Sequence, residues 1–190
     1  IFSLTGYQGI LGYRTQDDRD IAQDSPDRPA FDAYRASEIE AVKPVIARLK
    51  ETGWTFGSHT WGHIRLDTKP LQTVINDTER WADEVGSLVG PTQILFYPHG
   101  GRPDGDDWHS TGERFRYLQS QGFRIFASVG TSSFSHVKED ISAVICDRLH
   151  PDGTTLRGSK KVLSWYAQFY DAKDIIDLDV RPDLGVRWDE

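Results

Sequence analysis

The hydrophobic positions of the chain form short apolar runs that alternate with longer stretches typical of helices. Short runs with the composition of buried strands occupy residues 1–5, 54–58, 93–97, 123–129 and 143–147. Helices are predicted between and after them, at residues 32–52, 69–89, 113–121 and 155–170, the first two from apolar residues three and four positions apart. Strands that alternate with helices in this order predict a parallel sheet or a β/α barrel.

The residues that bound these stretches set the expected helix ends. Pro44 lies inside the first helical stretch and predicts a kink or two shorter helices, and Gly53 is a natural stop. In the second stretch Thr68 is the expected N-cap and Pro70 fits the first turn. Residues 6–31 form an irregular stretch that is too long for a plain connector, which predicts a functional loop or a loop specific to a subfamily.

The composition excludes several classes of function. The chain of 190 residues has 29 acidic and 22 basic side chains and a formal net charge of −7, which argues against nucleic acid or an anionic membrane surface as its main partner. No apolar stretch approaches the ~20 residues that span a bilayer, so no transmembrane segment is expected. The single cysteine, Cys146, excludes an internal disulfide and a cysteine-based zinc site. The length suits one domain over residues 1–190, and because Ile1 is not an initiator residue, we expect this domain to be incomplete at its N-terminus.

The histidines concentrate the candidate chemistry. Four of the six come just after predicted strands, and these are His59, His63, His99 and His150. Because the carboxyl ends of parallel strands converge on one edge of a sheet, we expect these side chains on the same face of the molecule. His109 and His136 lie in polar loops and are interpreted as ordinary loop residues, an interpretation that also stays open for His99.

His59 and His63 are the strongest pair, four positions apart with small and polar residues around them. Two histidines at this spacing can bind one metal ion when the segment coils into a helical turn. Imidazole suits zinc, cobalt, nickel and iron alike, so the spacing does not identify the metal.

The segment Ser58-His59-Thr60-Trp61-Gly62-His63 resembles the second motif of the polysaccharide deacetylases, the NodB-like carbohydrate esterases. The resemblance implies that His59 and His63 are ligands of a divalent metal, usually zinc. Carbohydrate of the N-acetylglucosamine type is then the implied substrate, and a secreted or cell-surface location is favoured. The implied fold is an α/β fold, a distorted and incomplete β/α barrel that covers most of the chain.

Two further segments are similar to motifs of this family in order and spacing. Tyr97-Pro98-His99-Gly100 resembles the third motif, a wall of the substrate groove in which the backbone N–H of His99 would help to hold the oxyanion. Leu149-His150 resembles the fifth motif, which implies that Leu149 lines the acetyl pocket and that His150 is the general acid. Trp61 and Tyr97 are candidates for stacking on sugar faces.

Several family features are missing or displaced. The first motif, a Thr-Phe-Asp-Asp strand end that carries the catalytic base and the third metal ligand, is absent, and the pair Asp17-Asp18 is interpreted as a solvated turn. Phe96 stands where the third motif has an arginine, and the Asp-Trp of the fourth motif does not follow the strand at residues 123–129, since Asp107-Trp108 lies one element too early. These departures predict a divergent member whose chain is impaired or inactive unless a missing front end is supplied.

The resulting hypothesis is metal-dependent hydrolysis of an N-acetyl or O-acetyl group on a carbohydrate. One alternative is a catalytically impaired carbohydrate-binding or cell-surface protein that keeps the barrel. Another is a metal-dependent amidohydrolase that acts on small amides.

Overall fold

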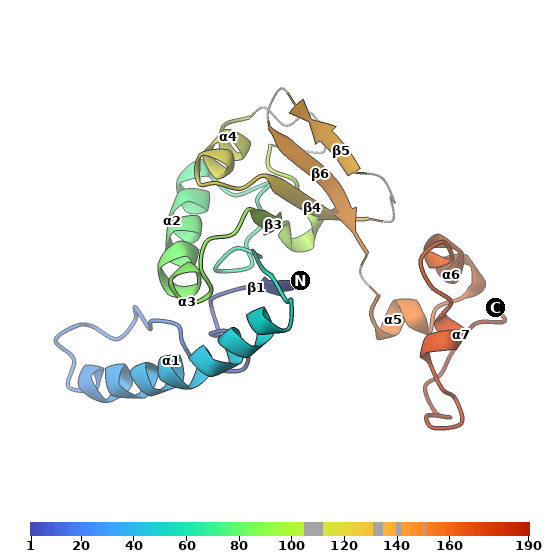
Figure 1. The fold of residues 1–190 in the computed structure, drawn as a ribbon, viewed down its shortest axis with the longest axis horizontal. Helices are drawn as coiled ribbons and strands as arrows, with labels where there is room; N and C mark the ends of the chain where they lie inside the picture. Colours follow the sequence, from blue (N-terminus) through green and yellow to red (C-terminus); the bar gives the residue numbers. More distant parts are fainter. Residues whose placement is uncertain (105–111, 131–134, 140–141, 150) are drawn as a thin grey trace. The chain divides into compact units, whose positions relative to one another are not determined.

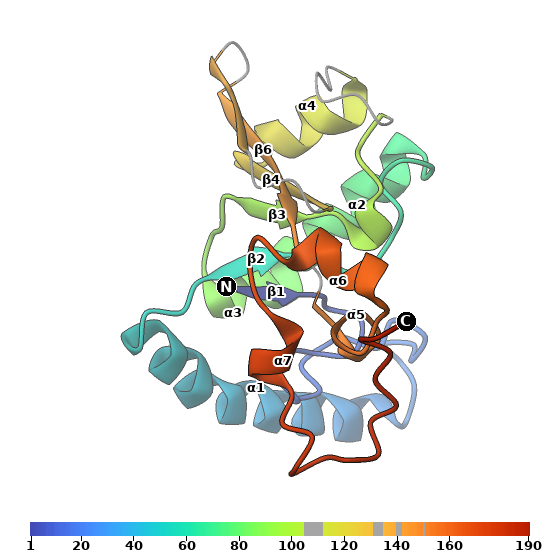
Figure 2. The same cartoon turned by 90° about the vertical axis from the view of Figure 1, so that its right-hand side faces the viewer.

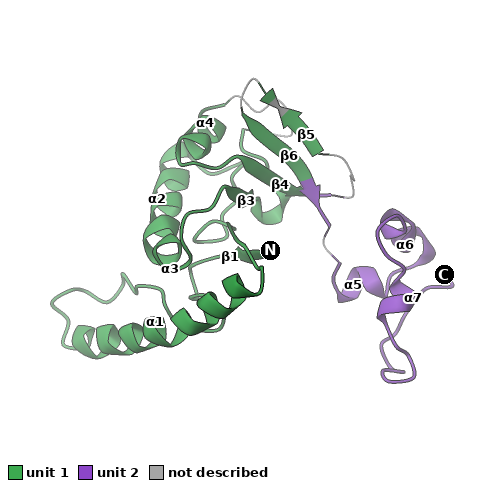
Figure 3. Ribbon diagram, in the orientation of Figure 1, with its two compact units in different colours: residues 1–128, 135–146 green, residues 129–134, 147–190 purple. Residues whose placement is uncertain are grey.

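The computed structural model describes residues 1–104, 112–130, 135–139, 142–149 and 151–190. Two compact units make up the chain, the first of residues 1–128 with 135–146 and the second of residues 129–134 with 147–190 (Figure 3). The expectation of one deacetylase-like domain over residues 1–190 stays a prediction.

The fold is α/β, and its sheet is mainly parallel. Its strands, in spatial order, are β1 (Phe2–Leu4), β2 (Phe56–Ser58), β3 (Ile94–Phe96), β4 (Ile125–Val129), β6 (Ala143–Arg148) and β5 (Ser135–Lys138). The pairs β1–β2, β2–β3 and β3–β4 are parallel, whereas β5 pairs antiparallel with β6. The predicted alternation of strands and helices is confirmed, but the described strands follow a linear order with β1 and β5 at its ends, so the barrel is not confirmed.

The first long helix, α1 (Arg28–Glu51), begins four residues earlier than the sequence pattern predicts and continues through Pro44 as one helix. Val42 and Ile46, on either side of the proline, are both buried. Because apolar residues before and after Pro44 pack on the same core, the expected division into two helices does not occur.

The second helical stretch is divided in a way that the sequence does not predict. It comprises α2 (Leu71–Trp81), a π-helical turn (Ala82–Gly86) and α3 (Ser87–Val89). Pro70 occupies the N-cap position without a side-chain cap, so the expected cap by Thr68 is wrong. The π-helical turn adds one residue to a helical turn, and within it both Glu84 and Val85 are buried.

Two apolar clusters hold these elements together. One contains residues of β1, β2, α1, α2 and α3, with Leu4, Val42, Phe56, Trp81 and Val89 among them. In the other cluster, α2 and α4 (Glu113–Ser120) lie side by side on one face of β3 and β4 (Figures 1 and 2). The two clusters together fix the ends of β2 and β3, from which the candidate site is built.

In the second unit two short helices, α5 (Gly153–Leu156) and α6 (Lys160–Tyr166), stand where a single helix is predicted, and α7 (Ala172–Ile175) follows them. Asp152 caps α5 by accepting hydrogen bonds from the backbone N–H groups of Thr154 and Thr155. Gly158 follows α5, and its weak helix propensity accounts for the break. No helix in the described ranges is long and apolar enough to cross a membrane.

Candidate active site

The turn after β2 carries the histidine pair. The backbone N–H of His59 still donates to the carbonyl of Leu4 in β1 (2.9 Å), and the chain then reverses through Thr60 (φ 60°) and His63 (φ 52°). The Thr60 hydroxyl accepts the backbone N–H of Ile64 at 3.0 Å. The pair is therefore presented by a tight turn with two left-handed residues, and not by the helical turn that the spacing suggested. Each such non-glycine residue costs about 1–2 kcal/mol, so other contacts must hold the turn in place.

Asp77 of α2 supplies one set of these contacts. Its two carboxylate oxygens accept the backbone N–H groups of Trp61 and Gly62, both at 2.7 Å. Burial raises the pKa of Asp77, while the two N–H donors and the charge of Arg80 oppose that rise. Asp77 is not among the residues predicted from the sequence; the available signal was a carboxylate between the apolar positions Val74 and Trp81 of a helix.

The side chain of Trp61 is held by protein on several sides. Its indole N–H donates to Glu84 Oε2 (2.9 Å), and the guanidinium of Arg80 lies 3.4 Å from the ring centroid. The backbone of Gly6 is close to the indole edge, since a Cβ at Gly6 would lie 2.2 Å from Trp61 Cδ1. These contacts attach the turn to its surroundings; stacking of Trp61 on a sugar stays a prediction.

Glu84 also binds the loop that precedes α1. Arg80 Nε donates to Glu84 Oε1 (2.7 Å), Arg80 Nη2 donates to the carbonyl of Asp17 (2.6 Å), and the N–H of Asp17 donates to Glu84 Oε2 (3.1 Å). The Asp17 carboxylate pairs with Arg28 at 2.7 Å. The interpretation of Asp17-Asp18 as a solvated turn is therefore wrong for Asp17, because the largely buried Arg28 requires a partner there.

The end of β3 brings a third imidazole to this turn. The ring centroids of His59 and His63 are 4.8 Å apart, and those of His63 and His99 are 4.5 Å apart, both in edge-to-face arrangements. His59 Nδ1 lies 2.8 Å from the carbonyl oxygen of Phe96. That contact fits a proton on Nδ1, with the lone pair then on Nε2, as in many metal-binding histidines. Histidines from three strand ends are predicted to converge, and this is confirmed for those after β2 and β3; His150, after the third strand, lies outside the described residues.

The third-motif segment turns sharply after β3. Pro98–Gly100 forms a single 3₁₀ turn in which His99 is left-handed (φ 56°) and exposed. Tyr97 and Pro98 are buried beneath it, and burial raises the pKa of the Tyr97 phenol well above its ordinary value. The Tyr97 ring packs near Phe126, with centroids 6.1 Å apart. The structure thus places Tyr97 and Pro98 as supports of the turn, and their predicted contact with substrate remains untested.

Residues 29–112 match the family model described as polysaccharide deacetylase. The resemblance to polysaccharide deacetylases is confirmed over this segment. It contains the His59–His63 turn, Asp77 and the turn that carries His99.

A solved structure from Mycobacterium smegmatis, provisionally described as a polysaccharide deacetylase, is similar to the chain with a TM-score of 0.42 and 12% identity. The match covers 80% of this chain and 53% of that one, so the chain spans about half of the length of this relative. No curated protein matches the chain significantly.

Other predicted site residues lie outside the segment that matches the family model or outside the described residues. His150, Asp107, Trp108 and His109 are not among the described residues, and Leu149 belongs to the second unit. The functions implied for Leu149 and His150 therefore stay predictions. Within the described parts of the chain, no group of three His, Cys, Asp or Glu side chains is arranged to hold a metal ion.

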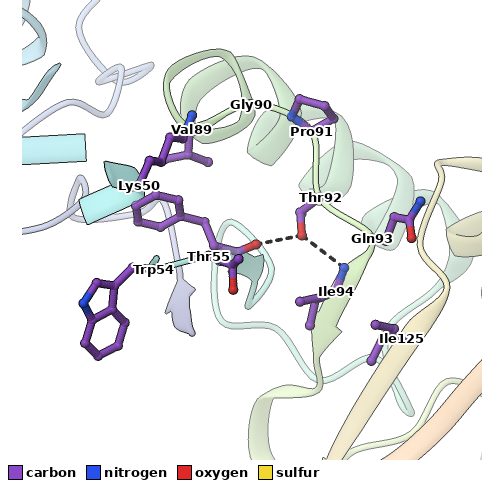
Figure 4. A pocket seen from close by; sticks show the side chains of 11 residues that line it. Lys50, Trp54, Thr55, Val89, Gly90, Pro91, Thr92, Gln93, Ile94 and Ile125 are labelled. Atoms are coloured by element: carbon purple, nitrogen blue, oxygen red, sulfur yellow. Dashed lines mark hydrogen bonds between the residues drawn. The ribbon is translucent and has the colours of Figure 1, made fainter. Parts of the chain in front are cut away.

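A cavity of about 450 Å³ lies at the opposite, amino-terminal end of the parallel strands (Figure 4). Its lining includes Lys50, the exposed Trp54, and residues that precede β2 and β3. The Thr92 hydroxyl donates to the carbonyl of Phe56 (2.8 Å) and accepts the N–H of Ile94 (3.1 Å). The histidines are at the other end of these strands, so the cavity and the candidate chemistry occupy opposite edges of the sheet.

Proposed function

We propose that the protein is a metal-dependent hydrolase that removes acetyl groups from N-acetylated or O-acetylated carbohydrate. The observation that carries the proposal is the convergence of His59, His63 and His99 at the carboxyl end of β2 and β3, inside the segment that matches the polysaccharide deacetylases. Active sites of parallel α/β proteins form at this edge, which supports the assignment.

A divalent metal, with zinc as the proposed ion, would be held by His59 and His63. The hydrogen bond between His59 Nδ1 and the Phe96 carbonyl supports this assignment, because it orients the imidazole ring and makes Nε2 the nitrogen that would bind the metal. Bound there, the metal would polarise the acetyl carbonyl and lower the pKa of a water molecule. Catalytic zinc usually has three protein ligands, so a further carboxylate is part of the proposal.

Other groups of this chain would stabilise the oxyanion and protonate the leaving amine. The backbone N–H of His99 is the proposed donor to the oxyanion, and preorganised backbone donors are effective in that function. His150 is the proposed general acid that protonates the leaving amine, for which its ordinary pKa of about 6.5 is suitable. The proposed base is the carboxylate of the first motif.

The test is acetate release from N-acetylglucosamine oligomers by the zinc-loaded protein in its longest natural form. We expect release by the natural sequence and loss of release in the double variant His59→Ala/His63→Ala, with folding of both checked by circular dichroism. No release from the zinc-loaded natural protein would contradict the proposed function. Ammonia or acid released from small amides, but no acetate from sugars, would instead support the amidohydrolase alternative.

A carbohydrate-binding protein without activity is the second candidate, favoured by the position of Phe96. Phe96 replaces the arginine of the third motif, and its ring lies against β2, where a Cβ at Gly57 would be 2.6 Å from Phe96 Cε2. An apolar ring supplies none of the charge of the expected guanidinium. Oligosaccharide binding by calorimetry that is unchanged in the double histidine variant, together with loss of zinc, would favour this candidate.

A further inference from the structure

Asp77 connects α2 to the centre of the histidine turn. Its side chain is 9% exposed, and both of its oxygens accept backbone N–H groups of the two consecutive residues Trp61 and Gly62 at 2.7 Å. A buried carboxylate is costly unless its oxygens are hydrogen-bonded, and bonds from N–H groups to a carboxylate are among the stronger ones. The carboxylate therefore fixes the backbone between the two histidines.

Gly62 allows this close approach. A Cβ at Gly62 would lie 3.1 Å from Asp77 Oδ2, tighter than ordinary contact. On the same helical run, seven residues after Asp77, Glu84 holds the indole of Trp61 at 2.9 Å. Two buried carboxylates of one helical run thus hold the backbone and the side chain of the same short turn.

The turn needs such support because its backbone is strained. Thr60 and His63 are both left-handed, and left-handed non-glycine residues persist where the surrounding structure enforces them. The second of these residues is itself a member of the histidine pair, so a relaxed backbone at His63 would rotate its imidazole away from His59. The orientation of the pair depends on contacts at residues 61 and 62.

We propose that Asp77 is a positioning residue that sets the mutual orientation of His59 and His63, and thereby the affinity of the pair for a divalent metal. The metal part of this inference rests on the proposed function. Asp77 itself acts through backbone N–H groups and does not touch metal or substrate.

The decisive variant is Asp77→Asn, which keeps the shape but replaces one acceptor oxygen with an NH₂ group that faces a backbone N–H. Asp83→Asn is the matched control, since Asp83 is exposed on the same helical run. We expect Zn²⁺ affinity, measured by chelator competition, to fall about 10-fold to 100-fold in Asp77→Asn and to stay unchanged in Asp83→Asn. The visible absorption spectrum of the Co²⁺-loaded protein should change in the first variant alone.

A metal-free measurement separates positioning from general stability. The imidazole ¹⁵N signals of His59 and His63 should shift in Asp77→Asn and remain in place in Asp83→Asn, under conditions in which urea unfolding shows both variants folded. Asp77→Glu, which keeps the charge and both acceptors, should restore part of the affinity and is the second variant if the asparagine protein does not fold.

The possible outcomes distinguish the two proposals. Unchanged zinc affinity and unchanged histidine signals in Asp77→Asn would overturn the positioning function of Asp77, whatever the activity of the protein. Asp77-dependent zinc binding in a natural protein that releases no acetate would support the positioning function and overturn the deacetylase. Histidine signals that depend on Asp77 in a protein without zinc affinity would limit the inference to orientation of the pair and overturn its metal part.

Discussion

The two ends of the parallel strands are built from different backbone conformations. Before β2, β3 and β4, the left-handed positions are the glycines Gly53, Gly90 and Gly122, which adopt this conformation without a side-chain penalty. After β2 and β3, the left-handed positions include Thr60, His63 and His99. Strained non-glycine residues thus occur at the carboxyl end, where the candidate site lies, whereas glycines occupy the corresponding positions at the amino end.

The cavity and the candidate catalytic residues also lie at different ends of the strands. The amino end has a cavity of about 450 Å³. The carboxyl end has three imidazoles close together, two of them on the turn that Asp77 of α2 contacts. A glycine at each amino-end turn adopts a positive φ without supporting contacts, whereas the strained turn at the carboxyl end is held by Asp77 and Glu84. Substitutions at the two ends should therefore differ in their effects on function and on stability.

The largest expected effect is a loss of zinc affinity on substitution at the carboxyl end and not at the amino end. His63→Ala should weaken zinc binding by more than about 100-fold and should abolish acetate release, since loss even of a residue that only orients a metal ligand costs about 10-fold to 100-fold in affinity. Lys50→Ala, at the rim of the amino-end cavity, should leave zinc affinity unchanged. Chelator competition and acetate assays measure both. An equal loss of zinc affinity in the two variants would remove the functional distinction between the ends.

The next effect concerns stability. Glu84→Gln removes the charge that pairs with Arg80 at 2.7 Å, with 16% and 6% of the two side chains exposed. Breaking a buried pair in this way should lower the free energy of unfolding by about 3 kcal/mol. Glu51→Gln breaks an exposed pair with Arg48 at the end of α1 and should cost less than about 1 kcal/mol. Urea denaturation of both variants is the measurement, and equal losses would show that burial of Glu84 is not decisive.

Part of this architecture follows from the sequence. The parallel strands were predicted from short apolar runs, and the meeting of His59 and His99 follows from the rule that parallel strands end at one edge. The antiparallel strand β5 was not predicted, because its four residues carry no apolar run. The contact of Asp77 with residues 61 and 62 depends on how α2 packs, and no local pattern encodes a hydrogen bond between a helix and a turn that lies about 15 positions earlier in the chain.

The boundaries of the helices are also predicted only in part from the sequence. Pro44 predicts a kink or two shorter helices, and the division into two helices does not occur, because Val42 and Ile46 on either side of it are both buried. In the second stretch the apolar spacing predicts one regular helix, yet a π-helical turn at Ala82–Gly86 brings Glu84 inward to bind Arg80 and Trp61. Local spacing reports which face is buried, and tertiary contacts decide where the helix departs from regular geometry.

The same substitution, glycine to alanine, can be made at each end of the strands. A Cβ at Gly6 would lie 2.2 Å from Trp61 Cδ1, so Gly6→Ala should displace the indole and cost about 2 kcal/mol. Gly53 has open space around it but a φ of 86°, so Gly53→Ala should cost about 1 kcal/mol. Only Gly6→Ala should weaken zinc binding. Equal effects on zinc affinity would show that the position of Trp61 does not affect the histidine pair.

The smallest expected effect is a difference in pH dependence between the ends. Asp67, whose carboxylate lies against Gly101 near the His99 turn, has its pKa lowered, first by the hydrogen bond from Arg65. The lowered pKa means that the folded state holds this proton less tightly than the unfolded state. The resulting stabilisation is present above the unfolded-state pKa of about 3.9 and is lost as the pH falls through the folded-state pKa.

Asp67→Asn should therefore lower the urea midpoint slightly at pH 7, and the difference from the natural protein should disappear at an acid pH below the folded-state pKa. High salt should also reduce it, because Arg65 is largely exposed. Thr92→Val at the amino end removes an uncharged hydrogen-bonding group, so its loss of about 1 kcal/mol should be the same at both pH values. A pH-independent loss in Asp67→Asn would mean that the ion pair with Arg65 does not support the carboxyl end, whose stability would then rest on the contacts made by α2.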